Sequence, residues 1–168
     1  MKNKGKGTED TMQKTNAMRQ LDAAGIPYEA KEYTYDESDL SGLHIAQSIG
    51  LDPDIVFKTL VAHGDKTPVA VFCIPCAYEL DLKKCARVTG NKRLELAAVK
   101  ELLGLTGYIR GGCSPIGMKK HFPTFIDETA LLAERITVSA GVRGCQLFLE
   151  PQKLIAFTGA VVCDLIGG

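Results

Sequence analysis

The spacing of apolar and polar residues predicts short helices and strands that follow one another along the chain. Apolar residues at helical spacing, in several cases ended by a glycine, predict helices at residues 12–24, 41–49, 82–89, 95–103 and 151–158. Alternating or continuous apolar runs predict strands at residues 28–35, 55–62, 69–75 and 122–128, two within 135–150, and one at 161–165. Hairpin-like strand pairs interspersed with helices predict a single-domain α+β fold with a bent, mixed or mostly antiparallel sheet.

A lysine interrupts the strand predicted at residues 55–62, whose sequence is IVFKTLVA. Strand alternation places Lys58 on the same face as Val56, Leu60 and Ala62, and that face should be buried. Its ammonium must then reach water or a partner, because desolvating an unpaired charge is costly. The residues alone leave two interpretations open: an edge-strand lysine that discourages pairing with another sheet, or a charge that serves a site.

Length and composition fit one globular domain. The chain has 168 residues, 45% of them apolar, and we expect residues 12–168 to fold while residues 1–11 form a disordered tail. Basic and acidic residues number 20 each, which excludes the broad basic field of a protein that coats nucleic acid. No run has the length of a transmembrane helix, and the polar N-terminus lacks the apolar core of a signal peptide. We therefore expect a cytoplasmic protein that contacts neither a membrane nor DNA.

Six cysteines raise the question of thiol or metal chemistry. Cys73 and Cys76 form a CIPC motif, which suits a redox pair or half of a zinc site. No second pair lies at a usable spacing for zinc, and the expected helix N-cap, Asp81, is five residues beyond Cys76, too far to acidify its thiol. The three histidines lie near no Ser or Cys in a nucleophile motif. We expect buried, reduced thiols, with no metal and no cofactor.

Two glycine-bearing loops are further candidates for chemistry. The stretch GGCSPIG at residues 111–117 can turn N–H groups toward a carbonyl or phosphate oxygen, because glycine permits positive φ and close approach. The stretch SAGVRG at residues 139–144 carries Arg143, whose guanidinium suits phosphate. Lys119 and Lys120 add positive charge after the first loop. Each stretch by itself also fits an ordinary turn or a solvated charge pair.

Five segments together resemble the YbaK/EbsC family of aminoacyl-tRNA deacylases, which is related to the editing domain inserted in bacterial-type prolyl-tRNA synthetases. They are, in order, LDPDIVFKTLV, ELDLKKCARVTG, TGYIRGGCSPIGMKK, PTFIDE and VSAGVRGCQLFLEPQKLIAFTGA. The resemblance covers roughly residues 17–160 and implies the fold of that family, a barrel-like sheet surrounded by short helices. It also implies trans-editing, the cleavage of a wrong amino acid, cysteine above all, from proline tRNA, which a synthetase pocket cannot reject by binding alone.

The resemblance implies roles residue by residue. Lys58 matches the family's catalytic lysine, and the backbone of Gly111 and Gly112 would polarise the ester carbonyl. Gln146 stands where some members have an aspartate, and Ser41 where an aromatic can occur, which bears on the preferred amino acid. The residues expected to bind substrate are Tyr33, Thr59, Cys113, Ser114, Pro115, Ser139, Gly141, Arg143 and Gln146.

The expected substrate is the 3′ end of an aminoacyl-tRNA, with prolyl-tRNA synthetase as a candidate partner in a ternary complex. In cysteine-specific members the substrate thiol is thought to attack its own carbonyl, whereas alanine-specific relatives position a water, so the first route needs no protein nucleophile. Two alternatives stay open. One is a non-catalytic module that binds a tRNA end or a nucleotide and acts with a synthetase, and the other is a thiol oxidoreductase that uses Cys73 and Cys76.

Overall fold

The computed structural model describes residues 13–167, so the tail predicted for residues 1–11 lies outside the described residues. Its helices are α2 (Asn16–Ala23), α3 (Gly42–Ile49), α4 (Leu82–Thr89), α5 (Leu102–Thr106) and α6 (Pro151–Thr158). Its strands are β1 (Glu29–Glu32), β2 (Phe57–Gly64), β3 (Val69–Pro75), β4 (Glu79–Leu80), β5 (Leu94–Leu96), β6 (Thr124–Asp127), β7 (Ile136–Ser139), β8 (Cys145–Leu149), β9 (Val161–Cys163) and β10 (Ile166–Gly167). Within that range, no helix has the length and apolar character needed to cross a membrane.

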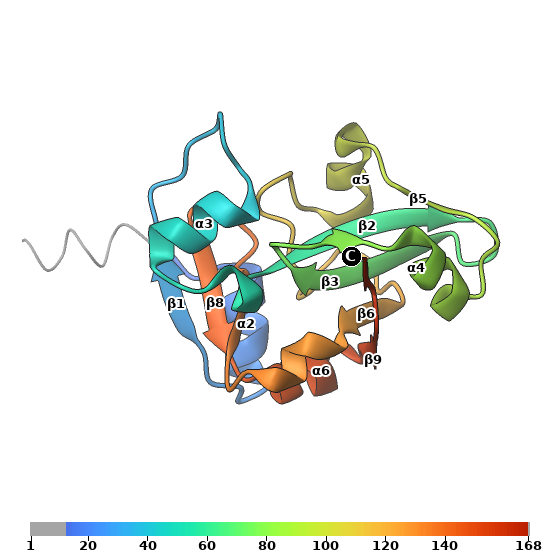
Figure 1. The fold of residues 1–168 in the computed structure, drawn as a ribbon. Coiled ribbons are helices and arrows are strands. Elements are labelled where there is room, and N and C mark those ends of the chain that lie inside the picture. The colour runs from blue at the N-terminus through green and yellow to red at the C-terminus, as the bar shows by residue number, and fades with distance from the viewer. Residues whose placement is uncertain (1–12, 168) are drawn as a thin grey trace, which may run out of the picture.

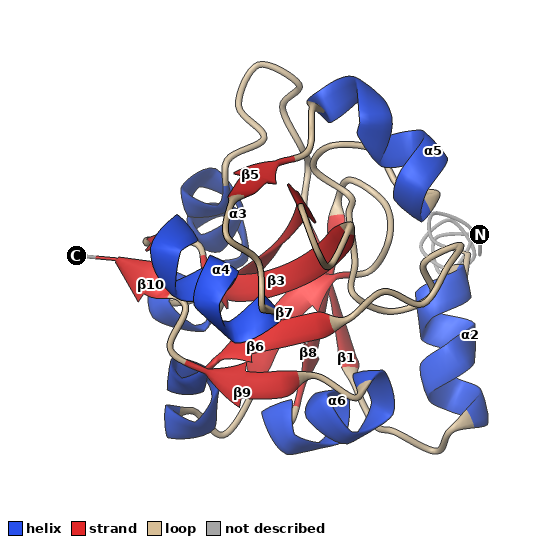
Figure 2. Cartoon of the chain, turned by 90° about the vertical axis from the view of Figure 1, so that its right-hand side faces the viewer, coloured by secondary structure: helices blue, strands red, loops and turns tan. Residues whose placement is uncertain are grey.

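Two main sheets form the framework (Figure 1). The larger has the order β5-β2-β3-β6-β9, with β2 antiparallel to both its neighbours and β6 parallel to both of its own. The smaller is antiparallel, in the order β1-β8-β7, and a backbone bridge from Val56 to Thr137 connects it to the start of β2. Helices α2 and α6 lie near its strands in Figure 2. The α+β class and the mixed sheet are confirmed, but the sheet is not closed, so the barrel-like feature is not observed.

Local sequence signals set the ends of several helices. Asp81 is the N-cap of α4, and its carboxylate accepts hydrogen bonds from two N–H groups of the first turn, each at 3.1 Å. Gly90 ends the same helix with φ of 75°, and Gly50 and Gly159 end α3 and α6 in the same left-handed region. Glycine adopts this conformation without the steric cost of a Cβ atom. The helix predictions at these three places are confirmed.

The helix predicted at residues 95–103 is wrong over most of its length. Leu94–Leu96 forms β5 instead, which pairs with the end of β2, and the N–H of Ala97 extends the pairing with a 2.9 Å hydrogen bond to a β2 carbonyl. A 3₁₀ turn follows, and α5 begins at Leu102 and continues past Gly104. Pairing with the available edge of β2 therefore overrides the helical spacing of the apolar residues in this segment.

Apolar cores lie on both faces of the larger sheet. On one face, Phe57 packs in a cluster with α2, α6 and the smaller sheet. On the other, Leu60 and Phe72 pack with α4 and with residues close to the C-terminus. A smaller cluster packs α3 against Val56 and Cys76. Packing thus fixes both faces of β2, and the edge of this strand is left for a site.

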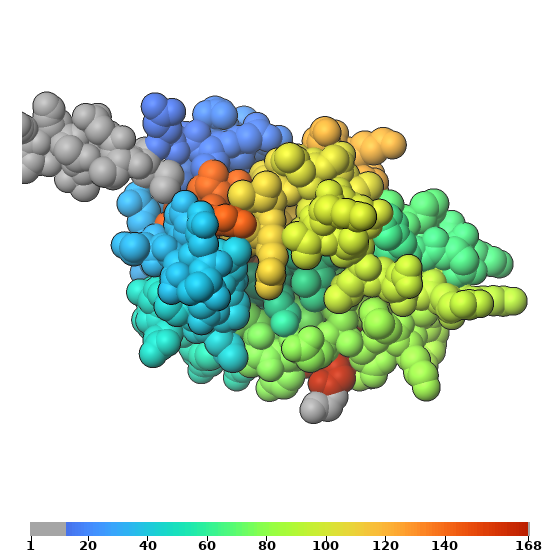
Figure 3. Space-filling model, turned by 90° about the horizontal axis from the view of Figure 1, so that it is seen from above, coloured from blue at the N-terminus to red at the C-terminus, as the bar shows by residue number. Residues whose placement is uncertain are grey.

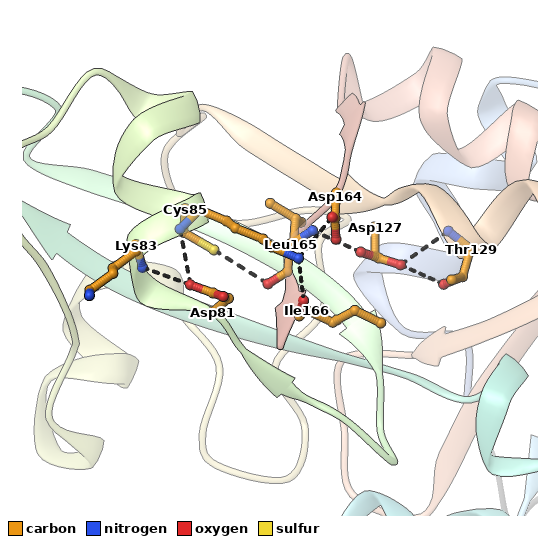
Figure 4. Close-up of polar contacts among 9 residues, drawn as sticks. Asp81, Lys83, Cys85, Asp127, Thr129, Asp164, Leu165 and Ile166 are labelled. Atoms are coloured by element: carbon orange, nitrogen blue, oxygen red, sulfur yellow. Dashed lines mark hydrogen bonds and ion pairs between the residues drawn. The ribbon is translucent and has the colours of Figure 1, made fainter. Parts of the chain in front are cut away.

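A cluster of polar contacts fastens the C-terminal residues to the domain (Figure 4). The Asp127 carboxylate is fully buried, and it accepts hydrogen bonds from the Leu165 N–H at 2.9 Å and from the N–H and hydroxyl of Thr129 at 3.1 and 2.7 Å. Such pairing offsets the cost of removing a carboxylate from water. We call this cluster the C-terminal latch, and it comprises Asp81, Lys84, Asp127, Asp164 and Leu165.

The latch also fixes a wall of the candidate site. The Leu165 carbonyl accepts a hydrogen bond from the Asp81 N–H at 2.8 Å, and Lys84 Nζ donates to Asp164 Oδ2 at 2.8 Å. Strand β10 then pairs with β4, which carries Glu79. The segment between β3 and α4 is therefore held from behind by the end of the chain.

Candidate active site

A cleft of about 450 Å³ follows the edge of β2. Strand β3 pairs along β2 on one side, whereas β5 pairs on the other side with Ala62–Gly64 and leaves most of residues 57–61 without a neighbouring strand. Figure 3 shows atoms of β2 (teal) at the bottom of a hollow between the segment around residue 40 (cyan) and the segment around residue 100 (yellow-green). The predicted site residues that line the cleft are Lys58, Thr59, Gly111, Cys113, Ser139 and Gln146.

Lys58 lies in the lining of this cleft, with Val56 and Leu60 forming apolar wall beside it. Its side chain is 27% exposed. Within residues 13–167, the ion-pair partner of its Nζ is Oε2 of Glu79, at 4.0 Å, and the Glu79 side chain is 92% exposed. Such an exposed pair contributes little, so the ammonium is available to a ligand. The edge-strand interpretation is therefore partly right. Lys58 lies where β2 has no neighbouring strand on one side, but this stretch of β2 forms the bottom of a cleft and is not the outer edge of the sheet.

The loop that follows α5 brings Gly111 and Gly112 to the site. Gly111 has φ of 86°, in a turn closed by a 2.9 Å hydrogen bond from the N–H of Gly112 to the carbonyl of Ile109. The N–H of Gly112 is therefore already used. Those of Gly111 and Cys113 have no hydrogen-bond partner in the part of the chain that the structure describes. Since both residues line the cleft, their N–H groups are better placed than that of Gly112 to bind an oxyanion.

Ser114 and Pro115 belong to the same loop but do not line the cleft. Ser114 is fully buried, and its hydroxyl accepts a hydrogen bond from the Ile116 N–H at 3.2 Å. Pro115 lines a separate pocket of about 230 Å³, together with His121 and Phe157. The structure thus places both residues where they shape the path of the loop.

The hairpin loop between β7 and β8 supports the first glycine loop. Ser139 lines the cleft, and its hydroxyl accepts a hydrogen bond from the Gly141 N–H at 3.0 Å. Gly141 has φ of 99°, and a Cβ atom there would lie 2.9 Å from Cε1 of Tyr108. This position therefore needs glycine both for its backbone angle and for the close approach of the Tyr108 ring.

Arg143 joins two loops and is not part of the cleft lining. Its Nε donates to the carbonyl of Arg110 at 2.9 Å, and one of its terminal nitrogens lies 3.8 Å from a carboxylate oxygen of Glu37. The guanidinium of Arg143, which the sequence predicts to bind phosphate, is thus used within the protein to hold the two loops together. Arg110 itself lines the cleft and has no ion-pair partner among the described residues. Sequence reasoning missed Arg110, for which the available signal was its place next to Gly111.

Gln146 and Tyr33 form the part of the site near β8. Gln146 is buried, lines the cleft, and accepts a hydrogen bond at Oε1 from the Thr137 hydroxyl at 2.9 Å. Burial raises the pKa of Tyr33, while the nearby Gly144 backbone and Gln146 side chain act in the opposite direction. Tyr33 is not part of the lining and lies beside Gln146. The side chain of Gln146 is a neutral amide, whereas an aspartate at this position would add negative charge to the cleft.

Three thiols lie in or beside the cleft. Cys76 and Cys113 line it, and Sγ of Cys73 is 3.9 Å from Oγ1 of Thr59. Burial raises the pKa of Cys73 to about 12 and the pKa values of Cys76 and Cys113 to about 11. All three are free thiols, and both redox chemistry and nucleophilic attack need the thiolate. The structure argues against the oxidoreductase alternative and against a protein cysteine as the nucleophile.

The mouth of the cleft is apolar, which sequence reasoning missed. Several of its residues lie within 95–103, where the predicted helix would have scattered them over different faces. In the structure the strand, the 3₁₀ turn and the start of α5 turn them toward one opening. The apolar residues at this opening are Leu40, Leu43, Leu96, Ala97, Val99 and Leu102.

A model of the aminoacyl-tRNA editing domain matches residues 43–157, a span that carries most of the cleft. The chain belongs to this family. Editing means removing a wrong amino acid from tRNA by cleaving its ester, so the editing-domain protein is an aminoacyl-tRNA deacylase.

Related proteins agree with this assignment. The editing-domain protein is 46% identical over 155 residues to a protein of Enterococcus faecalis provisionally named Cys-tRNA(Pro)/Cys-tRNA(Cys) deacylase EbsC, which covers 92% of this chain and 94% of that one. A crystal structure described provisionally as a trans-editing enzyme for prolyl-tRNA synthetase superposes with a TM-score of 0.80 at 28% identity, over 92% and 99% of the two chains. The structure of the hypothetical protein APE2540, at 23% identity, has a TM-score of 0.81 over 89% and 97% and shows the same fold.

Proposed function

We propose that the editing-domain protein is a free-standing enzyme that removes cysteine mischarged onto proline tRNA. The observation that carries the proposal is Lys58, whose ammonium lies in a cleft and meets one exposed carboxylate, that of Glu79, at 4.0 Å. Support also comes from relatives, because one is named as a Cys-tRNA(Pro)/Cys-tRNA(Cys) deacylase and another as a trans-editing enzyme for prolyl-tRNA synthetase.

The composition of the lining supports a small amino acid as substrate. Thr59, Cys113 and Ser139 are short side chains that line the cleft next to Lys58. Cysteine and proline differ little in volume, so a synthetase pocket discriminates weakly between them and a second site is needed to remove the product. The neutral Gln146 offers hydrogen bonds to the substrate without adding a charge.

In the mechanism that we propose, Lys58 places positive charge beside the ester or the terminal ribose. The N–H groups of Gly111 and Cys113 bind the carbonyl oxygen as negative charge develops on it. The substrate thiol attacks its own carbonyl carbon, so a carbon–sulfur bond forms, the ester carbon–oxygen bond breaks, and the departing ribose oxygen takes the proton that the thiol loses. Attack by water is the alternative route, which the same oxyanion donors would serve.

The proposal includes a partner that holds the body of the tRNA. Basic and acidic residues are equal in number, so the net charge of the chain supplies no overall attraction to a whole tRNA. We propose that the enzyme works in the cytoplasm and meets its substrate in a ternary complex with prolyl-tRNA synthetase. Purified synthetase should then lower the KM for charged tRNA without changing kcat.

The decisive experiment compares proline tRNA charged with cysteine, serine, alanine or proline. Loss of the radiolabelled ester is followed with and without the enzyme. We expect the cysteinyl ester to be cleaved fastest, and the seryl ester, which has the same shape but no thiol, to be cleaved much more slowly because its hydroxyl is a weaker nucleophile. Equal rates for cysteinyl and seryl esters would indicate attack by water.

The same panel tests the alternative of a non-catalytic module. Ester loss at the rate of the enzyme-free control, for all four substrates, would contradict the proposed activity. Tight binding of the charged tRNA in those samples would instead support a protein that holds a tRNA end and delivers it to a synthetase.

A further inference from the structure

Two lips of different chemistry flank the mouth of the cleft, on the two sides of the hollow in Figure 3. We call Leu96, Val99 and Leu102 the apolar lip. We call residues 36–43, which lead into α3 and include its first two residues, the acidic lip. Lining residues come from both, so any substrate that reaches Lys58 passes between them.

The apolar lip leaves hydrophobic side chains in water. Leu96 is 50% exposed and Val99 is 58% exposed, although both line the cleft. Grouped apolar side chains beside a polar site are typical of a surface that a ligand covers. A flat aromatic group with little charge would remove this surface from water.

The acidic lip repels a phosphodiester chain. It carries Asp36, Glu37 and Asp39, and hydrogen bonds from neighbouring serines hold the pKa values of Asp36 and Asp39 below their ordinary range. Glu37 has Arg143 as a partner at 3.8 Å, and Asp39 lies 3.8 Å from a ring nitrogen of His44. These aspartates stay ionised at neutral pH, so a nucleic acid would not run along this side.

Positive charge lies in the loop that runs from the acidic lip to α5. At one end, the Arg110 carbonyl accepts a hydrogen bond from Arg143, which pairs with Glu37 of the acidic lip. Residues 110–120 include Arg110, Lys119 and Lys120 and no acidic residue. The Lys119 N–H donates to the carbonyl of Thr106 at 3.0 Å, which ties the end of this stretch to α5. Arg110 lines the cleft and has no ion-pair partner among residues 13–167, so its guanidinium is available to a phosphate.

We propose that the apolar lip binds the adenine of the terminal nucleotide of tRNA and that Arg110 binds the phosphate before it. The proposal rests on the proposed function, because the amino acid is esterified to the ribose of that nucleotide. With the ester beside Lys58, the attached adenosine must lie at the mouth. The apolar lip offers uncharged apolar surface, whereas the acidic lip combines Leu40 and Leu43 with nearby carboxylates. The guanidinium of Arg110 comes from the loop between the two lips.

The test is a binding experiment with two uncharged RNA oligonucleotides labelled with fluorescein at the 5′ end. One ends in ACCA and the other lacks the last adenosine. Fluorescence anisotropy should show that the wild type prefers the first. The double variant Leu96→Ser, Val99→Ser should weaken binding of the first about tenfold and abolish the preference, because adenine contributes through burial of apolar surface.

Three further variants locate the effect. Leu132→Ser is the matched control, because Leu132 is 86% exposed and lies away from the cleft, and it should bind as the wild type does. Arg110→Gln should weaken both oligonucleotides equally and reduce the salt dependence of binding by about one phosphate contact. Loss of the preference in Leu43→Ser, with the apolar-lip variant unchanged, would place adenine on the acidic lip and overturn the proposal.

Kinetics separate this proposal from the deacylase proposal. With cysteinyl-tRNA, the apolar-lip variant should raise KM and keep kcat, since it removes binding remote from the ester. If the wild type cleaves cysteinyl-tRNA but binds both oligonucleotides equally well, the adenine site is overturned and the deacylase activity is supported. Preference for the terminal adenosine without any cleavage would support the adenine site and overturn the activity.

Discussion

The cleft and the C-terminal latch use polar groups in opposite ways. In the latch, both carboxylate oxygens of buried Asp127 accept hydrogen bonds, and the N–H and carbonyl of Leu165 are both paired. In the cleft, Lys58 meets one exposed carboxylate at 4.0 Å, and the N–H groups of Gly111 and Cys113 have no partner among the described residues. Fully paired groups fix a fold, whereas groups held unpaired in a cleft are available to a ligand. Pairing therefore separates the structural cluster from the functional one.

The largest expected effect comes from comparing two lysines. Lys58→Met should lower kcat for cysteinyl-tRNA by about 1,000-fold, because it removes charge stabilisation of the transition state, and should leave Tm unchanged. Lys84→Met removes a lysine that is paired with Asp164 at 2.8 Å, so it should lower Tm slightly and keep kcat. Deacylation rates and thermal melts of both variants measure the contrast. The same loss of kcat in both variants would mean that pairing does not separate the two regions.

The next effect concerns stability and belongs to the latch. Asp127→Ala leaves the buried N–H of Leu165 without a partner, so the free energy of unfolding should fall by about 3 kcal/mol. Asp164→Ala is the control, because Asp164 is half exposed and its loss should be small. Urea unfolding followed by circular dichroism measures both. Equal losses would show that burial of the carboxylate does not decide its importance.

Much of the fold follows from local signals in the sequence. The hairpin of β2 and β3 and the helix capped by Asp81 come from alternation, turn residues and an N-cap, each of which acts within a few residues. The strand at Leu94–Leu96 could not be predicted from local sequence signals. Its helical spacing is real, but β2 has an unpaired edge that only the folded chain brings near, and strand pairing prevails there.

The site is predictable to a different extent. Lys58, Gly111 and Ser139 lie in the lining, as the resemblance led us to expect, and their roles remain predictions. Arg143 shows the limit, since its contacts with Glu37 and Arg110 arise between loops that are distant in sequence. The available partner of a long side chain is set by tertiary packing, so sequence spacing could not tell that this guanidinium is used within the protein.

Two glycines test how firmly the backbone of the cleft is set. Gly141→Ala puts a Cβ atom at φ of 99° and 2.9 Å from the Tyr108 ring, so the free energy of unfolding should fall by about 2 kcal/mol. Gly104→Ala is the matched control, because Gly104 lies within α5 and a Cβ atom there would meet no neighbouring group within 4 Å. Alanine at this position should stabilise the helix by up to about 1 kcal/mol. Urea unfolding of both variants checks the opposite signs. A loss in Gly104→Ala equal to that in Gly141→Ala would contradict them.

The smallest effect belongs to a pair that is neither buried nor unpaired. His63 Nε2 lies 3.0 Å from Glu101 Oε1, and the Glu101 carboxylate also accepts the Ala98 N–H at 2.9 Å, behind the apolar lip. The hydrogen bond with Glu101 raises the pKa of His63 above its ordinary 6.5, and the same contact lowers the pKa of Glu101 below its ordinary 4.5. Both side chains are partly exposed, so water and salt weaken the pair.

The sign of this effect can be measured. Because the folded pKa of His63 is raised, its contribution is complete below pH 6.5 and is lost as pH rises through the folded value, while that of Glu101 needs pH above 4.5. His63→Gln should therefore lower Tm more at pH 5.5 than at pH 8.5, and 1 M NaCl should narrow the difference. His121→Gln is the matched control for removing a histidine, because His121 is exposed and has no ion pair among the described residues. A His63→Gln difference that is the same at both pH values would show that the contact acts through shape, in which case charge pairing plays no part in holding the apolar lip.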